Sequence, residues 1–385
     1  MYGLTDAQSR LVRTAAEIAA KTLAPQAADV DRGATFPSAG LDALAGAGLF
    51  GLCLPSSVGG LGQPPRVFAA VVEELASACA STAMIYVMHV TAAQVLAAAP
   101  ALAGKDELLK QVAAGKHLTT LAFSERGSRS QFWAPVSKLE EKAGGYVTSA
   151  YKSWVTAAAH ADSYVSSAQI PGAKSPAESV LYLVKRGAPG VRVASGFDGL
   201  GLRGNESTPV VIDGLAVAKS DLLTALGEGA KGMLEIVLPW FVVGTSAMAN
   251  GLCRAAVAVT AAHLSGTGFE HTGDKLRDFP VLRARLAQMS CKTEQSRALL
   301  SYTVRDMEAP SASTPLYVLE SRLAALEAAL EVTDLAMKSC GGAAFSKQLG
   351  LERLFRDARA GWVMAPTVDH LCDFIGRALT GLPLF

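Results

Sequence analysis

The sequence predicts a mainly helical α+β protein with a β-rich centre. Apolar residues recur at helical spacing from Asp6 to about Ala114, which predicts a first helical region. Short runs of alternating, β-branched character follow from Thr119 to about Val217. Helical periodicity returns from Gly227 onward. The order is therefore helical, then β, then helical bundle.

Length and composition agree with this division. The chain has 385 residues, 50% of them apolar and 18% charged, enough for a large buried core in two to three domains. We place an N-terminal helical domain at 1–117, a middle β domain at 118–225 and a C-terminal four-helix bundle at 226–385. The net charge of +1 argues against nucleic acid or an anionic membrane surface as the main partner.

The first domain shows its helical period most clearly after residue 66. Val67, Val71, Leu75 and Ala78 fall on one helical face, and the turn-rich stretch 55–65 precedes them. This spacing predicts an amphipathic helix packed on a core.

The middle region consists of runs of 4 to 10 residues, such as GYVTS at 145–149, KSWV at 152–155 and GVRVAS at 190–195, with Gly, Pro, Asn or Asp near most breaks. It also holds a G-x-G-x-x-G pattern from Gly199 to Gly204. A dinucleotide fingerprint needs a helix after its glycines, whereas TPVVIDGLAV at 208–217 predicts a strand. We therefore expect a turn between β-strands at 199–204.

In the last region, Leu316 to Met337 carries a 3.6-residue apolar stripe. The stretch APSASTP at 309–315 separates two long helices, and glycines 341 and 342 end the second, where a left-handed cap is expected. The apolar stretch Met233–Leu252 contains Glu235, a proline and an asparagine. It predicts a buried bundle helix rather than a membrane span.

Other signals are weak. The N-terminus has no signal-peptide pattern, which with the scattered cysteines predicts a cytoplasmic protein with reduced thiols. The six histidines lack metal-ligand spacing, so no metal site is expected.

Several segments, in this order, resemble signatures of the acyl-CoA dehydrogenase family of flavoproteins. The matching segments are Gly48–Pro55, Gly59–Gly62, Glu73–Leu75, Leu121–Ser130, Lys152–Thr156, Leu200–Gly204, Cys340–Gly342 and Arg353–Ala358. The resemblance extends over essentially the whole chain and implies that family's three-domain fold.

The resemblance also implies FAD as cofactor. By correspondence, Trp154 packs on the isoalloxazine ring and Thr156 hydrogen-bonds to it, Phe123 and Ser124 contact its pyrimidine side, and Ser130 reaches the pyrophosphate. A second set matches family positions nearer the C-terminus. Thr367 and Asp369 correspond to FAD contacts, and Lys338, Gly341 and Gly342 to a loop that touches the cofactor of a neighbouring subunit.

The chain departs from the family at the catalytic base. Most members carry a glutamate in a Glu-Gly-Thr motif, where this chain has Ala365-Pro366-Thr367. Others place the glutamate on the first long helix of the last domain, where Trp240 stands here. Alanine and tryptophan accept no proton, and no acidic residue lies within two positions of either site. The usual proton acceptor is therefore missing.

Three side chains are candidates for reactive groups. Arg129 replaces a small residue of the family pattern and either holds an anion or pairs with Glu125 at the surface. His89 lies on a first-domain helix whose family counterpart approaches the substrate cavity, and packing in a core is its alternative. His370 follows Asp369 and is a second possible substitute for the base.

These observations imply an FAD-dependent oxidoreductase acting on an acyl-CoA or a related compound, with a relocated or dispensed-with base. One alternative is a flavin-dependent monooxygenase on the same fold, and another is a non-catalytic homologue. The resemblance further implies an electron-transfer flavoprotein or a flavin reductase as partner, and a homodimer or homotetramer. The family's Arg-x-x-Phe-Gly contact with FAD across subunits appears here as Phe269–Gly273, without its arginine and its phenylalanine.

Overall fold

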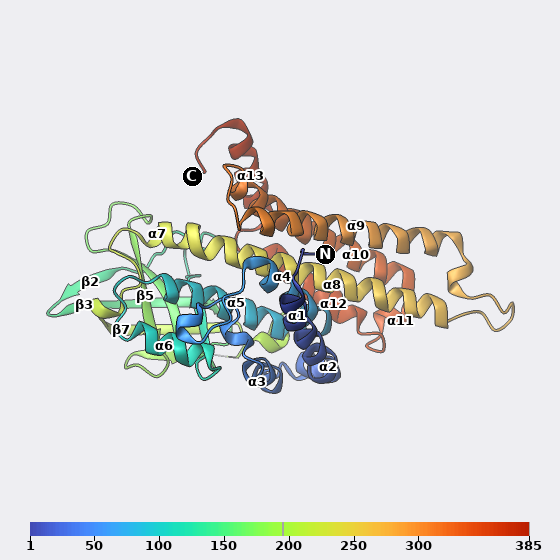
Figure 1. Ribbon diagram of the computed structural model, residues 1–385, viewed down its shortest axis with the longest axis horizontal. Coiled ribbons are helices and arrows are strands. Elements are labelled where there is room, and N and C mark those ends of the chain that lie inside the picture. The colour runs from blue at the N-terminus through green and yellow to red at the C-terminus, as the bar shows by residue number, and fades with distance from the viewer. Residues whose placement is uncertain (195, 385) are drawn as a thin grey trace.

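The computed structural model describes residues 1–194 and 196–384 (Figure 1). Its N-terminal part is helical, as predicted. The helices are α1 (Asp6–Ile18), α2 (Ala24–Gly33), α3 (Ser38–Gly46), α4 (Pro65–Ala78), α5 (Ala80–Ala98) and α6 (Lys105–Ala113).

Local sequence explains where these helices begin and which face they bury. Thr5 caps α1 through a capping box with Gln8, which satisfies backbone N–H groups at the helix start. In α4 the predicted apolar face is buried at Val67, Val71 and Leu75. Helix α5 is buried on nearly every side, which makes it a core helix.

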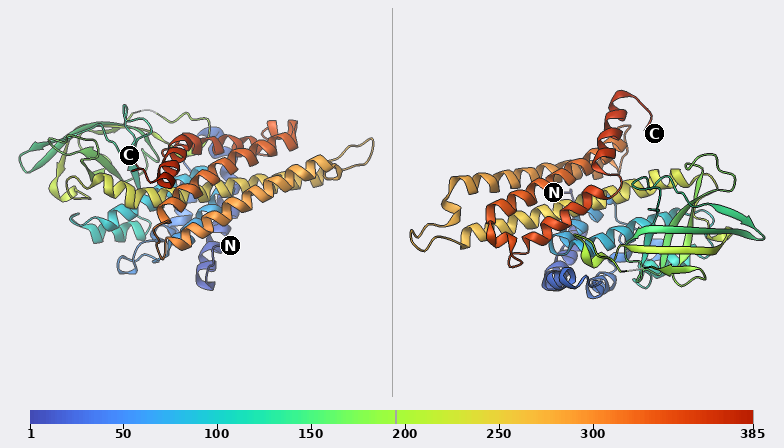
Figure 2. Two further views of the ribbon diagram at one scale, coloured as in Figure 1. Left: turned by 90° about the horizontal axis from the view of Figure 1, so that it is seen from above. Right: turned by 180° about the vertical axis from the view of Figure 1, so that it is seen from behind.

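The middle region forms two sheets (Figures 1 and 2). One has the strand order β1-β4-β5 and the other β2-β3-β7-β6. Strands β1 and β4 pair in parallel, and the other pairs are antiparallel. The strands are β1 (Thr119–Ala122), β2 (Leu139–Lys142), β3 (Gly145–Val155), β4 (Ser163–Gln169), β5 (Ser179–Lys185), β6 (Val191–Val193) and β7 (Thr208–Ala218).

Two sequence expectations are refined here. The separate β-like runs at 145–149 and 152–155 form a single strand, β3. The run at 190–195 corresponds to β6, and its last residue, 195, lies outside the described residues. The stretch 199–204 lies between β6 and β7 with no following α-helix, so the expectation of a turn between strands is confirmed.

The C-terminal part is a bundle of long helices that extends away from the sheets (Figure 2). The linker at 309–315 falls between α9 and α10, as expected, while Gly341 has φ 55° and ψ −133°, outside the expected left-handed helical region. The elements are α7 (Gly229–Gly232), a π-helical turn (Met233–Val237), α8 (Leu238–Gly266), α9 (Pro280–Asp306), α10 (Thr314–Cys340), α11 (Gly342–Phe345), α12 (Leu351–Val363) and α13 (Val368–Thr380).

The three regions share one hydrophobic core. Helices α4 and α5 pack against α8, and α5 also packs against β1. Two helical stretches, Ala80–Ala98 and Gly229–Gly266, are long and apolar enough to cross a membrane, yet both are mostly buried inside the protein. Buried bundle helices have the same properties, so these stretches are weak evidence for a membrane span. The predicted buried helix at 233–252 is part of the second stretch.

Candidate functional site

A pocket of about 760 Å³ lies where the three regions meet. Its walls come from α5, the loop after β1, the end of β3, the turn before β7, the start of α8 and the end of α12. The size suits a small-molecule or cofactor site. Most of its lining surface is apolar, and five hydroxyl and five charged side chains of the described residues also line it.

The end of β3 supplies an indole and a hydroxyl to this pocket. Ser153, Trp154 and Thr156 all line it, although a regular strand turns successive side chains to opposite faces. The pairing of β3 with β7 shifts register between Lys152 and Val155, and this irregularity brings the three side chains to one cavity. Thr156 Oγ1 lies 3.1 Å from Ser207 Oγ.

Trp154 is 64% exposed, an unusual state for a large apolar side chain beside a cavity. Trp362, which also lines the pocket, is 52% exposed. The hydroxyls of Ser124 and Ser130 line the cavity too and have no hydrogen-bond partner within residues 1–194 and 196–384. The exposed indole faces and the hydroxyls without partners lie in one cavity. This combination suits a flat aromatic ligand with a polar edge, such as the flavin that the resemblance implies.

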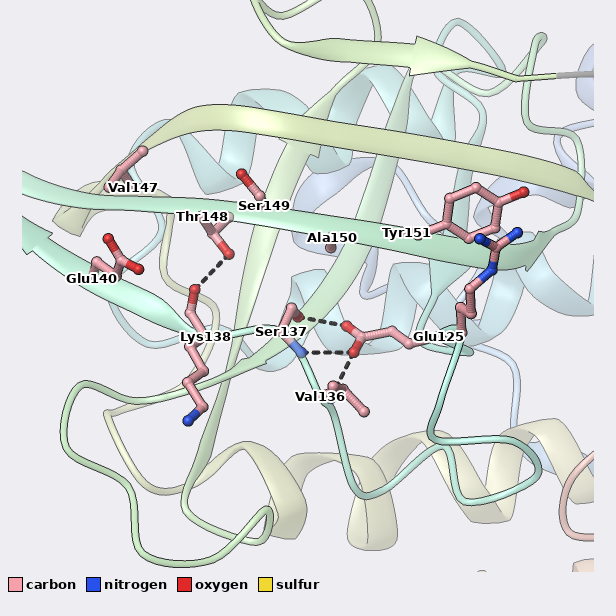
Figure 3. Close-up of a pocket in the computed structure, with 11 residues that line it drawn as sticks. Glu125, Val136, Ser137, Lys138, Glu140, Val147, Thr148, Ser149, Ala150 and Tyr151 are labelled. Carbon is pink, nitrogen blue, oxygen red and sulfur yellow. Dashed lines mark hydrogen bonds between the residues drawn. The ribbon is translucent and has the colours of Figure 1, made fainter.

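The loop that carries Ser124 is held by a buried ion pair. Lys152 Nζ lies 2.5 Å from Glu125 Oε1, and both side chains are almost fully buried. Backbone N–H groups of Val136 and Ser137 donate to Glu125 Oε2, and Ser137 Oγ donates to Oε1. Figure 3 shows Glu125 turned toward Ser137, beside a second cavity, of about 390 Å³, that is lined by residues of β2 and β3.

The ionisation of Glu125 is fixed by this setting. Burial opposes the charged form, but the Lys152 ammonium and the hydrogen bonds from Lys152 and Ser137 outweigh it, so the pKa of Glu125 is lowered. Both carboxylate oxygens already accept hydrogen bonds. Glu125 therefore organises the loop and is a poor proton acceptor.

Arg129 lines the pocket and is exposed. Its proposed pairing with Glu125 is wrong, because Glu125 is bound to Lys152 instead. In the described part of the chain Arg129 makes no ion pair, which leaves its guanidinium available to an anionic ligand.

The turn at 199–204 forms a further edge of the pocket and ties it to α12. Leu202 N donates to the buried Asp357 Oδ1 at 2.7 Å, and Arg356 donates to Leu200 O. A Cβ on Gly201 would lie 2.5 Å from Arg356 O, so only glycine permits this approach. Burial raises the pKa of Asp357 to about 6.

The two family positions of the base differ in their placement. Ala365 lines the pocket, next to Met364. Trp240 does not line it and packs on Phe68 with ring centroids 5.7 Å apart, whereas its neighbour Phe241 does.

The two histidine candidates do not line the pocket. His89 is fully buried, accepts a hydrogen bond from Thr119 N at Nδ1 and packs on Phe50. Burial lowers its pKa to about 4. Its neighbour Met88 lines the cavity, so α5 borders the cavity while His89 itself packs in the core, which was the alternative for this residue.

His370 lies at the start of α13, where Thr367 accepts a hydrogen bond from His370 N, and its ring packs near Trp133. Thr367, Asp369 and His370 lie outside the pocket lining. Lys338, Gly341 and Gly342 are exposed at the end of α10 and also lie outside it. Their predicted cofactor contacts remain predictions.

The sequence did not single out several lining residues. Met84 and Met88 lie one turn apart on α5, and an i, i+4 pair on a buried helix gives no sign of which face borders a cavity. Trp362 lies in the last turn of the amphipathic helix α12, and a tryptophan at that position was the available signal.

Models of one protein family match three successive parts of the chain. Models of the N-terminal, middle and C-terminal domains of acyl-CoA dehydrogenases match residues 5–116, 120–215 and 227–380.

Similar curated proteins cover nearly the full length. A probable acyl-CoA dehydrogenase of Bacillus subtilis strain 168, YngJ, is 26% identical over 93% of this chain and 94% of its own. The cyclohex-1-ene-1-carbonyl-CoA dehydrogenase of Geobacter metallireducens is 25% identical over 98% of this chain and 99% of its own. The human mitochondrial short-chain specific acyl-CoA dehydrogenase is 26% identical over 92% of this chain and 86% of its own.

Solved structures share the fold. Butyryl-CoA dehydrogenase from Megasphaera elsdenii superposes with a TM-score of 0.93 at 22% identity, covering 98% of this chain and 99% of that one. PigA with FAD and proline superposes with a TM-score of 0.91 at 20% identity, covering 99% of each chain.

Proposed function

Because the chain belongs to the acyl-CoA dehydrogenase family, whose members are FAD-dependent oxidoreductases, we propose that it acts on a coenzyme A thioester in the pocket beside Trp154. We further propose that no protein carboxylate removes the substrate's α-proton there. The observation that carries this second point is Ala365, an alanine in the pocket wall at the usual position of the base.

The family assignment confirms FAD as the cofactor and makes the chain an enzyme. When bound, FAD supplies an acceptor for a hydride. In our proposal Trp154 holds the ring system by its exposed indole face, Thr156 and Ser124 hydrogen-bond to the ring edge, and Ser130 reaches the pyrophosphate. Phe123 closes the apolar side of the same loop.

The carboxylates that line the pocket favour a reaction without a protein base over a reaction with a base at a new position. Among the described lining residues the acidic ones are Glu125 and Asp198. Glu125 is bound to Lys152, and the side chain of Asp198 is 92% exposed and pairs with Arg203. Neither presents an unpaired carboxylate to the cavity, and neither His89 nor His370 lines it.

The alternatives are less well supported. The three relatives named above are dehydrogenases of acyl-CoA compounds, and this does not favour the monooxygenase. Because they are enzymes, they also do not favour a non-catalytic homologue. An electron-transfer flavoprotein or flavin reductase as partner, a homodimer or homotetramer and a cytoplasmic location remain predictions.

The test uses the FAD-loaded enzyme without oxygen. A panel of acyl-CoA thioesters is mixed with the wild type and with Ala365→Glu, and loss of the yellow oxidised-flavin absorbance is followed. Ala365→Glu places a carboxylate in the cavity, because residue 365 lines it. A positioned general base contributes about a hundredfold or more, so we expect the variant to bleach the flavin at least a hundredfold faster with a simple saturated acyl-CoA.

Ala365→Gln is the matched control, with nearly the same size and no carboxylate, and it should behave as the wild type. Rapid bleaching of the wild type that neither variant alters would show that a protein base acts elsewhere. If no thioester in the panel bleaches the flavin of either the wild type or Ala365→Glu, the proposal of an acyl-CoA substrate is refuted.

A further inference from the structure

Arg322, on α10, is a fully buried arginine directly behind the pocket wall. Its Nη1 donates to Thr245 Oγ1 on α8, its Nη2 to Met364 O at 3.1 Å and its Nε to Pro366 O at 3.3 Å. Its guanidinium carbon lies 5.0 Å from the centroid of the Phe241 ring.

These contacts surround one part of the cavity. Phe241 and Met364 both line the pocket, and so does Ala365, which lies between the two carbonyl groups that Arg322 binds. The cation is therefore one layer of side chain and backbone away from the ligand space, at the place where the base would stand in related enzymes.

The charge of Arg322 is not neutralised. No carboxylate lies within ion-pair distance of it in the described part of the chain. Carbonyl and hydroxyl oxygens and a ring face solvate a guanidinium but carry no net negative charge, and an isolated buried charge is strongly unfavourable. Burial lowers the pKa of Arg322 to about 9, so the side chain is still charged at neutral pH.

Two other arginines that line the pocket, Arg356 and Arg359, differ in this respect. Arg356 is paired with Asp31 and Arg359 with Asp334. The charges of Arg356 and Arg359 are compensated, and the unpaired Arg129 lies on the loop after β1. The unbalanced positive potential on the wall formed by Phe241, Met364 and Ala365 therefore comes from Arg322, and a negatively charged ligand group is the missing counter-charge.

We propose that Arg322 makes this wall of the pocket selective for an anion, and that the acyl part of the substrate carries a carboxylate which lies against Phe241 and residues 364–365. Arg322 is then a specificity-determining residue that acts through the wall and not by direct contact. The inference rests on the proposed thioester function and narrows its substrate to carboxyacyl thioesters.

The test compares two thioesters with five-carbon acyl chains, glutaryl-CoA with a terminal carboxylate and pentanoyl-CoA with a terminal methyl group. Calorimetry on the FAD-loaded enzyme without oxygen gives the Kd of each. We expect the wild type to bind glutaryl-CoA at least tenfold more tightly than pentanoyl-CoA. In Arg322→Met the two Kd values should agree within about twofold.

Two further variants separate charge from packing. Arg322→Lys keeps the positive charge and should keep most of the preference. Thr245→Val removes an oxygen that Arg322 binds but leaves the charge, so it should lower the melting temperature without abolishing the preference. If Arg322→Met does not fold, equal Kd values of the two thioesters for the wild type still overturn the proposal. Loss of the preference in Arg129→Met, which removes an unpaired guanidinium of the pocket lining, would assign the selectivity to Arg129 and overturn it as well.

The outcomes distinguish the two proposals. Equal binding of both thioesters to the wild type, or a preference that survives in Arg322→Met, would overturn the role of Arg322 and leave the thioester function intact. Binding of neither thioester, to the wild type or to Arg322→Lys, would overturn the proposed function and this inference with it.

Discussion

At the scale of single residues, the most telling side chain is Trp154. The sequence assigns it to the flavin by resemblance, and the structure places its indole, 64% exposed, in the lining of a 760 Å³ cavity. A tryptophan that stabilised the fold would be buried, so its exposure fits a role in binding a ligand. Lys152, two residues earlier, is the contrast: it is fully buried and paired with Glu125.

We therefore expect Trp154→Ala to weaken FAD binding by about tenfold or more, because stacking and apolar burial on the indole are lost. The melting temperature of the apo-protein should change little, since the side chain is mostly exposed. Equilibrium dialysis with FAD measures the first effect and calorimetric melting the second.

Trp154→Phe is the control for this prediction, because it keeps an aromatic face, and it should recover most of the affinity. An unchanged Kd for FAD in Trp154→Ala would remove Trp154 from the cofactor site.

At the scale of elements, the turn at 199–204 joins all three regions. Its backbone accepts from Arg356 and donates to Asp357 on α12, while Arg356 also pairs with Asp31 on α2. Helix packing thus explains a glycine of the G-x-G-x-x-G pattern at 199–204, which resembles a dinucleotide fingerprint in sequence only. Close approach of two backbones requires a residue without a Cβ at Gly201.

Gly201→Ala should destabilise the protein by about 1 to 3 kcal/mol, because its Cβ would lie 2.5 Å from Arg356 O and the turn must move away from α12. Urea unfolding followed by circular dichroism measures this change. Gly196→Ala is the matched control, since nothing lies within 4 Å of the Cβ it would add. Equal stability of the two variants would show that the turn adapts without strain.

At the scale of the whole molecule, the buried side chains of His89 and Asp357 make the free energy of unfolding depend on pH in opposite directions. The pKa of His89 is lowered to about 4, so between about pH 6.5 and 4 the unfolded chain binds a proton that the native state does not. Acidification through that window therefore destabilises the fold. The pKa of Asp357 is raised to about 6, so between about pH 6 and 3.8 the native state binds the extra proton and acidification stabilises it.

Each effect is on the order of 3 kcal/mol over its full window. Compared with the wild type, His89→Gln should lose less stability between pH 7 and pH 4.5, and Asp357→Asn should lose more. Urea unfolding at the two pH values measures both differences. Parallel pH profiles for all three proteins would show that neither group titrates as described.

The sequence by itself determined the helical, β and helical order, the family and FAD, because hydrophobic period and short signatures are local properties of the chain. It also located Trp154, Thr156, Ser124 and Arg129, which the structure brings to one pocket.

Only the tertiary structure decided which other residues share that pocket. It turned His89 toward Phe50 and Met88 toward the cavity, bound Glu125 to Lys152 and not to Arg129, and placed Arg322 behind Ala365. The physical reason is that these relations depend on distances between segments far apart in the chain, and on burial, neither of which is encoded in local spacing.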